Sequence, residues 1–245
     1  MNNRLIRLLI SLIASVILMF LLVTVTPAEN PPRLLVMFGG TMPEGLIQGF
    51  TYFLFIFGML EVGHINRKLT YENDAFSAKL LPEQDNWVLS AEDVNQLKLN
   101  MQQLEHNQKF LLTDLIKKAC TKYRLSKSSS EVLGLVDSQV NIYRSQMDSE
   151  QAFIRYTAWA IPSVGFIGTV LGIAAALGYA DQAGTTEGLK QVTDMLGVAF
   201  DTTLVALLLS IVLMFGIHYI DKKQEELFSR MSSYLNENLI NRFYK

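Results

Sequence analysis

Threonine and serine side chains occur inside two long apolar segments, where hydroxyls could bond an ion, a hydrated proton or a neighbouring helix. The segments cover residues 160–180 and 195–220. At a rise of about 1.5 Å per residue, each can cross a hydrocarbon core of about 30 Å as a helix. Small and hydroxyl-bearing residues recur at helical spacing in both, so each set shares one face. The sets are Gly165, Thr169, Gly172 and Ala176, then Ala199, Thr203, Ala206 and Ser210.

Such a stripe of small residues has two interpretations. Small side chains let helix backbones approach closely in lipid, and hydroxyls can bond across the contact. One stripe alone therefore indicates close packing, with each hydroxyl satisfied by the backbone of its own helix. Two matched stripes favour a shared, weakly polar lining, which would suit a narrow ion path or a socket for another helix.

Asp201 is an ionisable residue inside the second segment. Such a residue is costly in a membrane and is a functional candidate for that reason. It lies two residues from Thr203, about 200° round the helix and off the small-residue face. It either belongs to an ion path or anchors a contact between helices, within one subunit or between neighbours. Thr202 lies between the two faces and could serve either purpose.

Two runs within these segments resemble the core of the MotA/TolQ/ExbB proton-channel family. They are PSVGFIGTVLGI at 162–173 and GVAFDTTLVAL at 197–207, within a similar region of about 150–220. The G-T-V-x-G-I run, from Gly168 to Ile173, is its most specific part. A departure is Ala206, where related sequences often carry glycine.

The resemblance implies an ion-conducting subunit of a membrane motor that couples ion-motive force to rotation or mechanical work. It implies a homopentamer around two copies of a single-span MotB/ExbD/TolR-like partner, which would bring a titrating membrane aspartate. The transported ion would be a proton or sodium. The expected ion-pathway residues are Thr169, Thr203, Thr202 and Asp201. The expected helix-packing and partner-contact residues are Gly165, Gly168, Gly172, Ala176, Ala199, Ala206 and Ser210.

The rest of the chain predicts an all-α polytopic membrane protein. Half of the residues are hydrophobic and the mean hydropathy is positive. Four transmembrane helices are expected at about 6–25, 45–63, 157–180 and 195–220, the first of them uncleaved. The predicted organisation is a first transmembrane hairpin (1–63), a cytoplasmic helical segment (64–155), a channel-forming hairpin (156–220) and a cytoplasmic tail (221–245).

Positive charge predicts the orientation. The N-terminus, the 64–155 segment and the tail carry nineteen Lys and Arg residues, whereas the connections at 26–44 and 181–194 carry two. This asymmetry places both termini and the large polar segment in the cytoplasm. The expected location is the bacterial inner membrane, with lipid around the spans.

Local signals mark helix ends in the polar segment. Ser90 with Asp93 resembles a capping box, and Ser128 with Glu131 suggests a second helix start. From there one long helix is expected to run into the third span. Glu61 and His64 mark the end of the second span and are expected to be interfacial residues among lipid headgroups, although they could also pair across one helical turn.

Several function classes are disfavoured. The three histidines, His64, His106 and His218, are far apart and lack metal-ligand spacing. The single cysteine, Cys120, excludes an intrachain disulfide, and the near-neutral charge gives no support for nucleic-acid binding. We therefore expect no enzyme, no metal and no cofactor. From a different class, the alternative is a non-conducting membrane scaffold or receptor whose small-residue faces serve only helix packing.

Overall fold

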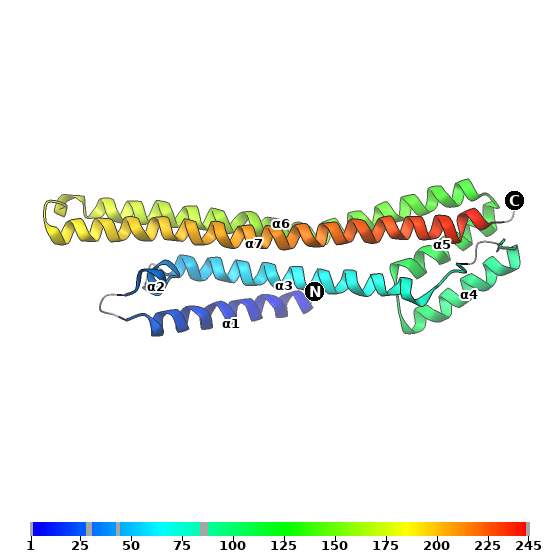
Figure 1. The fold of residues 1–245 in the computed structure, drawn as a ribbon, viewed down its shortest axis with the longest axis horizontal. Coiled ribbons are helices and arrows are strands. Elements are labelled where there is room, and N and C mark those ends of the chain that lie inside the picture. The colour runs from blue at the N-terminus through cyan, green and yellow to red at the C-terminus, as the bar shows by residue number, and fades with distance from the viewer. Residues whose placement is uncertain (1, 28–30, 43–44, 84–87, 244–245) are drawn as a thin grey trace. The chain divides into compact units, whose positions relative to one another are not determined.

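The computed structural model describes residues 2–27, 31–42, 45–83 and 88–243, and in these ranges the secondary structure is helical apart from one isolated β-bridge between Leu89 and Phe243 (Figure 1). The order is α1 (Asn2–Val25), α2 (Arg33–Met37), α3 (Leu46–Asp74), η1 (Ala75–Ala78), α4 (Ala91–Asn107), α5 (Leu111–Ser126), α6 (Ser129–Gly178), η2 (Ala180–Gln182), α7 (Thr186–Asn238) and η3 (Ile240–Arg242). Within the described ranges four helical stretches are long and apolar enough to cross a membrane. The predicted all-α, four-span fold is confirmed.

The chain divides into two compact units. The first contains Met1–Gly63 and Ala152–His218, and the second contains His64–Gln151 and Tyr219–Lys245. Helices α3, α6 and α7 each contribute residues to both units. The expected long helix from Ser129 into the third span is present as the 50-residue α6.

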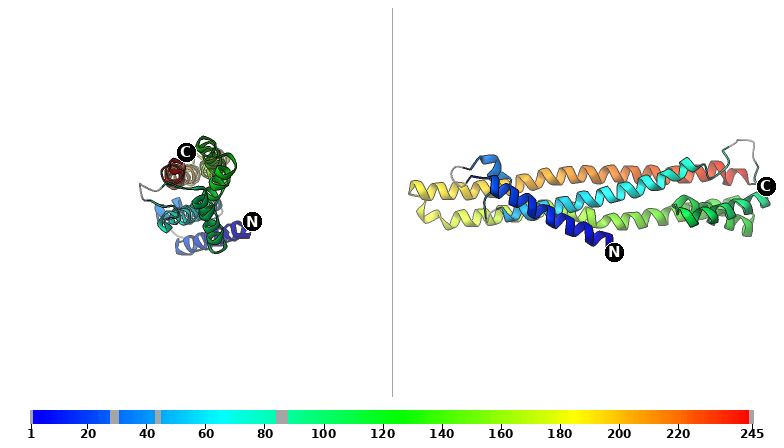
Figure 2. Two further views of the ribbon diagram at one scale, coloured as in Figure 1. Left: turned by 90° about the vertical axis from the view of Figure 1, so that its right-hand side faces the viewer. Right: turned by 90° about the horizontal axis from the view of Figure 1, so that it is seen from below.

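In the first unit, α6 and α7 run side by side in opposite directions (Figures 1 and 2). Helix α3 packs on α7 through Gly58, where an added Cβ would lie 2.7 Å from a methyl carbon of Leu213. Helix α1 packs on α3 at Gly49, beneath the side chain of Met19. Glycine at these two positions therefore lets neighbouring spans approach closely.

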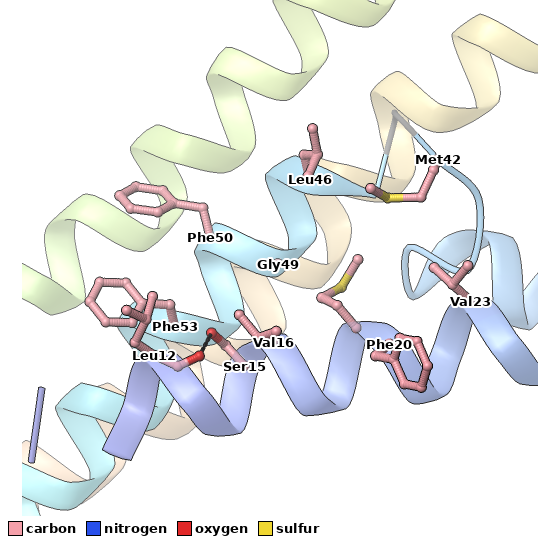
Figure 3. Close-up of a pocket in the computed structure, with 11 residues that line it drawn as sticks. Leu12, Ser15, Val16, Phe20, Val23, Met42, Leu46, Gly49, Phe50 and Phe53 are labelled. Carbon is pink, nitrogen blue, oxygen red and sulfur yellow. Dashed lines mark hydrogen bonds between the residues drawn. The ribbon is translucent and has the colours of Figure 1, made fainter. Parts of the chain in front are cut away.

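An apolar groove of about 500 Å³ lies between α1 and α3 (Figure 3). Its lining includes Val16, Phe20, Phe50 and Phe53. The hydroxyl of Ser15, also in the lining, donates to the carbonyl oxygen of Leu12 on its own helix at 2.9 Å. The polar atom is thereby satisfied within α1, and the groove presents hydrocarbon to the membrane.

A short helix lies in the connection between the first two spans. Within the described residues 31–42, this is the five-residue helix α2. Tyr52 of α3 holds this connection, because its hydroxyl donates to the carbonyl oxygen of Phe38 at 2.9 Å. Gly39 has φ of +88°, which glycine adopts readily. These contacts hold the connection that carries Arg33, the first residue of α2.

In the second unit, both predicted helix starts are confirmed. Ser90 and Asp93 form the reciprocal capping box at the start of α4. The Ser128 hydroxyl accepts from the backbone N–H of Glu131 at 3.4 Å, at the start of α6. Each contact satisfies a backbone donor that the first turn of a helix leaves without a partner.

Polar contacts join the helices of the second unit. Tyr143 of α6 donates to Asp114 of α5 at 2.5 Å, and Lys118 forms an ion pair with the same carboxylate at 2.8 Å. Burial raises the pKa of Asp114, but the bonds from Lys118 and Tyr143 outweigh it, so the pKa is lowered overall. Burial raises the pKa of the Cys120 thiol to about 12, so this cysteine is inert as a nucleophile.

Candidate functional site

The two small-residue stripes face each other across the contact between α6 and α7. A Cβ added to Gly165 would lie 2.5 Å from that of Ala206, and one added to Gly172 would lie 2.7 Å from that of Ala199. Both distances are too short for real carbon atoms. The stripes therefore form a close backbone-to-backbone contact within one chain, as small residues do in membranes. Ala176, the last member of the α6 stripe, is buried.

Thr169 and Thr203 meet in the middle of this contact. Their hydroxyls are hydrogen-bonded to each other. The Thr169 hydroxyl also lies 3.0 Å from the carbonyl oxygen of Ala199, and the Thr203 hydroxyl lies 2.8 Å from that of Gly165. The hydroxyls thus bond across to the opposite helix, rather than only to their own. Both side chains are half-buried, so one side of the pair is accessible from outside the chain.

This hydroxyl pair can accept hydrogen bonds or bind a cation. Each threonine hydroxyl has one proton and two lone pairs. The Thr169 hydroxyl can donate to Thr203 or to the carbonyl oxygen of Ala199, and the Thr203 hydroxyl can donate to Thr169 or to that of Gly165. Each of these arrangements leaves at least one lone pair on each hydroxyl oxygen. Such lone pairs can accept from a hydrated proton or coordinate sodium. The arrangement therefore provides two neighbouring oxygen ligands in an otherwise apolar contact.

Thr202 differs from its neighbour Thr203 in its surroundings. It is buried and covers Gly168, where an added Cβ would collide with the threonine side chain. Its hydroxyl lies 2.9 Å from the carbonyl oxygen of Ala199 on its own helix and 3.4 Å from that of Gly165 on α6. Thr202 and Gly168 therefore pack against one another, and the Thr202 hydroxyl is enclosed.

Ser210 compensates for a proline in the opposite helix. Pro162 lies inside α6 and has no N–H to donate to the carbonyl of Ala158, four residues earlier. The Ser210 hydroxyl of α7 donates to this carbonyl oxygen at 3.2 Å and is itself buried. In a membrane an unpaired backbone carbonyl is costly, so Ser210 satisfies a group that α6 cannot satisfy itself.

Ser210→Ala is expected to lower the free energy of unfolding by about 1–2 kcal/mol, because the Ala158 carbonyl loses its donor. In a Pro162→Ala background, a restored N–H would satisfy that carbonyl, and the same serine change should cost much less. Denaturant titration in a mild detergent measures both differences. Ser163→Ala is the matched control, since that hydroxyl bonds back to Trp159 on its own helix. An equal cost of Ser210→Ala in both backgrounds would contradict the assignment.

Asp201 forms an ion pair with Arg33. The two guanidinium nitrogens of Arg33 lie 2.5 and 2.9 Å from the two carboxylate oxygens, a bidentate arrangement. Asp201 is only 5% exposed, whereas the Arg33 side chain is 64% exposed. The pair therefore joins α2, in the connection between the first two spans, to α7 next to Thr202.

Arg33 also lines a hollow of about 670 Å³ beside the first residues of α7. Polar and apolar residues both contribute to it, among them Thr41, Lys190, Asp194 and Gly197. Arg33, which is bonded to Asp201, lines this hollow, whereas Asp201 is not among its lining residues. The carboxylate is thus engaged in a contact within the chain.

The second carboxylate within the spans, Glu61, is also paired, which corrects the expectation for this residue. It is only 3% exposed, and Arg7 of α1 donates to it at 2.7 Å. The Glu61 side chain is therefore covered by α1, rather than exposed to the lipid headgroups. The signal in the sequence was Arg7, a cation in the first apolar run that requires an anion nearby.

The sequence profile of the MotA/TolQ/ExbB proton channel family matches residues 102–233, more than half of the chain. The chain therefore belongs to this family, and it is a multi-pass membrane protein. The match extends beyond the expected 150–220 on both sides and includes much of the second unit. No curated protein matches the chain, and no solved structure matches it. Proteins of this family are channels rather than enzymes, and they work in complexes with single-span partners.

Proposed function

We propose that this protein is the ion-conducting subunit of a membrane motor, and that Thr169 and Thr203 line its ion path. The observation that carries the proposal is the half-buried hydroxyl pair between α6 and α7, which keeps lone pairs on both oxygens. The family supports it, because proton channels define that family. The path conducts protons or sodium, and the ion-motive force drives rotation or other mechanical work.

The carboxylate that titrates during transport comes from a partner. Among the described residues of the four spans, the carboxylates Glu61 and Asp201 are each bonded to an arginine. Both carboxylates are therefore engaged in ion pairs within the chain. A single-span MotB/ExbD/TolR-like chain with a membrane aspartate supplies the missing group beside Thr169 and Thr203.

Five copies of the chain surround two such partner helices in this proposal. Loading and unloading of the partner aspartate changes which subunit face it prefers, so ion flow moves the partner relative to the ring. Both termini and the polar segment lie in the cytoplasm, and the membrane is the bacterial inner membrane. The positive charge of these segments supports this orientation. Asp201 holds α2 on α7, and Thr202 packs between the helices.

Native mass spectrometry of the gently solubilised protein tests the assembly, alone and with a co-expressed single-span neighbour that carries a membrane aspartate. We expect five copies that take up two partner chains. A monomer or dimer that ignores every such partner, across several mild detergents, would contradict the proposal. Gly165→Leu provides the control for assembly, because its side chain would collide with Ala206 and separate α6 from α7.

The alternative function is a non-conducting scaffold or receptor. It is favoured by the observation that the stripe hydroxyls Thr169, Thr203 and Ser210 all have hydrogen-bond partners within the chain. Ion flux through reconstituted vesicles separates the two functions. Flux that appears only when the partner is present supports the channel, whereas an assembled complex without flux supports the scaffold.

A further inference from the structure

Two arginines of α1 share one carboxylate of α3. Arg7 donates to Glu61 at 2.7 Å, whereas the nearest Arg4 nitrogen lies 3.7 Å from the other carboxylate oxygen. The second contact is electrostatic and too long for a hydrogen bond. The cluster formed by Arg4, Arg7 and Glu61 thus has a formal charge of +1. The Arg7 side chain is largely covered, but that of Arg4 is 43% exposed.

An aromatic row on α6 continues this cluster. The Arg4 guanidinium carbon lies 4.7 Å from the centre of the Phe153 ring, a cation–π contact. The ring of Tyr156 follows at 6.4 Å from that of Phe153, and Trp159 follows at 5.9 Å from Tyr156. Tyr156 and Trp159 are both exposed, the latter by 66%. A cation and two amphipathic rings therefore lie on one accessible surface.

This surface lies at one end of the membrane spans. Arg4 stands at the start of the first span, Glu61 near the end of the second apolar stretch, and Trp159 near the start of the third. Since successive spans cross in opposite directions, these three positions belong to the same side of the membrane. Tyrosine and tryptophan prefer the depth of the lipid headgroups, and an arginine there meets phosphate.

We propose that Arg4 and the exposed aromatic rings of Tyr156 and Trp159 form a binding site for the headgroup of an anionic phospholipid. The guanidinium of Arg4 donates to the lipid phosphate, while Glu61 and the Phe153 ring fix its position. The tyrosine hydroxyl and the indole N–H supply further donors at the same depth. The excess positive charge of the cluster selects anionic over zwitterionic lipid. The site is independent of ion conduction, because it involves neither Thr169 nor Thr203.

The chain carries a fluorescent reporter within the site. It has two tryptophans, Trp159 and Trp87, the second outside the described residues. In a Trp87→Phe protein, quenching of fluorescence reports on lipids that contact Trp159. The protein is reconstituted in phosphatidylcholine vesicles with a small, equal fraction of either brominated phosphatidylglycerol or brominated phosphatidylcholine. We expect phosphatidylglycerol to be enriched about fivefold at Trp159 over phosphatidylcholine, which corresponds to one arginine at the membrane surface.

Arg4→Gln should abolish this enrichment, whereas Arg124→Gln, which removes the same charge from α5, should retain it. Equal quenching by both lipids in the Trp87→Phe protein, in which Arg4 is intact, would overturn the proposal. This comparison needs no Arg4 variant, so a folding defect of such a variant cannot affect it. Enrichment that survives Arg4→Gln would also overturn the proposal. Loss of the enrichment in inorganic phosphate, but not in chloride of equal ionic strength, would assign the site to free phosphate instead of lipid.

Discussion

Thr203→Val is expected to abolish partner-dependent ion flux while leaving the assembly intact. Valine has nearly the same shape, so the close contact between α6 and α7 is retained, but one of two neighbouring hydroxyls is lost. A hydrogen bond from a charged group to the Thr203 hydroxyl would contribute about 1.5–3 kcal/mol. Its loss should therefore lower the rate of ion flux by a factor of at least about ten. Flux through vesicles that contain the complex measures the loss, and native mass spectrometry checks the assembly.

The neighbouring residue provides the matched control. Thr202→Val removes a hydroxyl one position earlier, but there the side chain is buried against Gly168, and its shorter hydrogen bond is to Ala199 on its own helix. We expect nearly normal flux in this variant. Thr169→Val should resemble Thr203→Val, and the double variant should lose little more, since the two hydroxyls act together. Normal flux in Thr203→Val would remove this residue from the path.

The sequence predicts the fold of this protein because membrane spans are local features. Twenty apolar residues in one run must form a helix in lipid, whatever the rest of the chain does. The capping signal at Ser90 and Asp93 is also local, and the structure confirms it. The positions of the two stripes follow from helical spacing. Their spacing did not show whether they face one another, a partner or a neighbouring subunit.

The interactions that the sequence could not assign are those between residues far apart in the chain. Arg33 and Asp201 are 168 positions apart, and Arg7 and Glu61 are 54 apart. Periodicity along one helix says which face a side chain occupies, but not which element covers that face. The role of Ser210 depends on a carbonyl that Pro162 leaves without its donor in another helix. Charged residues and prolines within the predicted spans are the features of the sequence that indicate where such long-range contacts form.

Arg33→Gln should destabilise the first unit more than Asp201→Asn, although both changes break the same ion pair. Loss of Arg33 leaves a carboxylate that is almost completely buried and unpaired, and breaking a buried pair in this way costs about 3–5 kcal/mol. Loss of Asp201 leaves an arginine that is already mostly exposed, so the cost should be about 1 kcal/mol. Denaturant titration of both variants and of the double variant measures the asymmetry.

The double variant separates the two roles considered for Asp201. If the pair only holds α2 on α7, Arg33→Gln with Asp201→Asn should be about as stable as Asp201→Asn alone, since no buried charge remains, and flux should persist. Val198→Ala, which alters the same hollow without touching the ion pair, is the control. If Asp201 itself carries ions, flux disappears in both proteins with Asp201→Asn, whatever their stability. The ion path would then include a carboxylate of this chain, and the titrating group would not come from the partner alone.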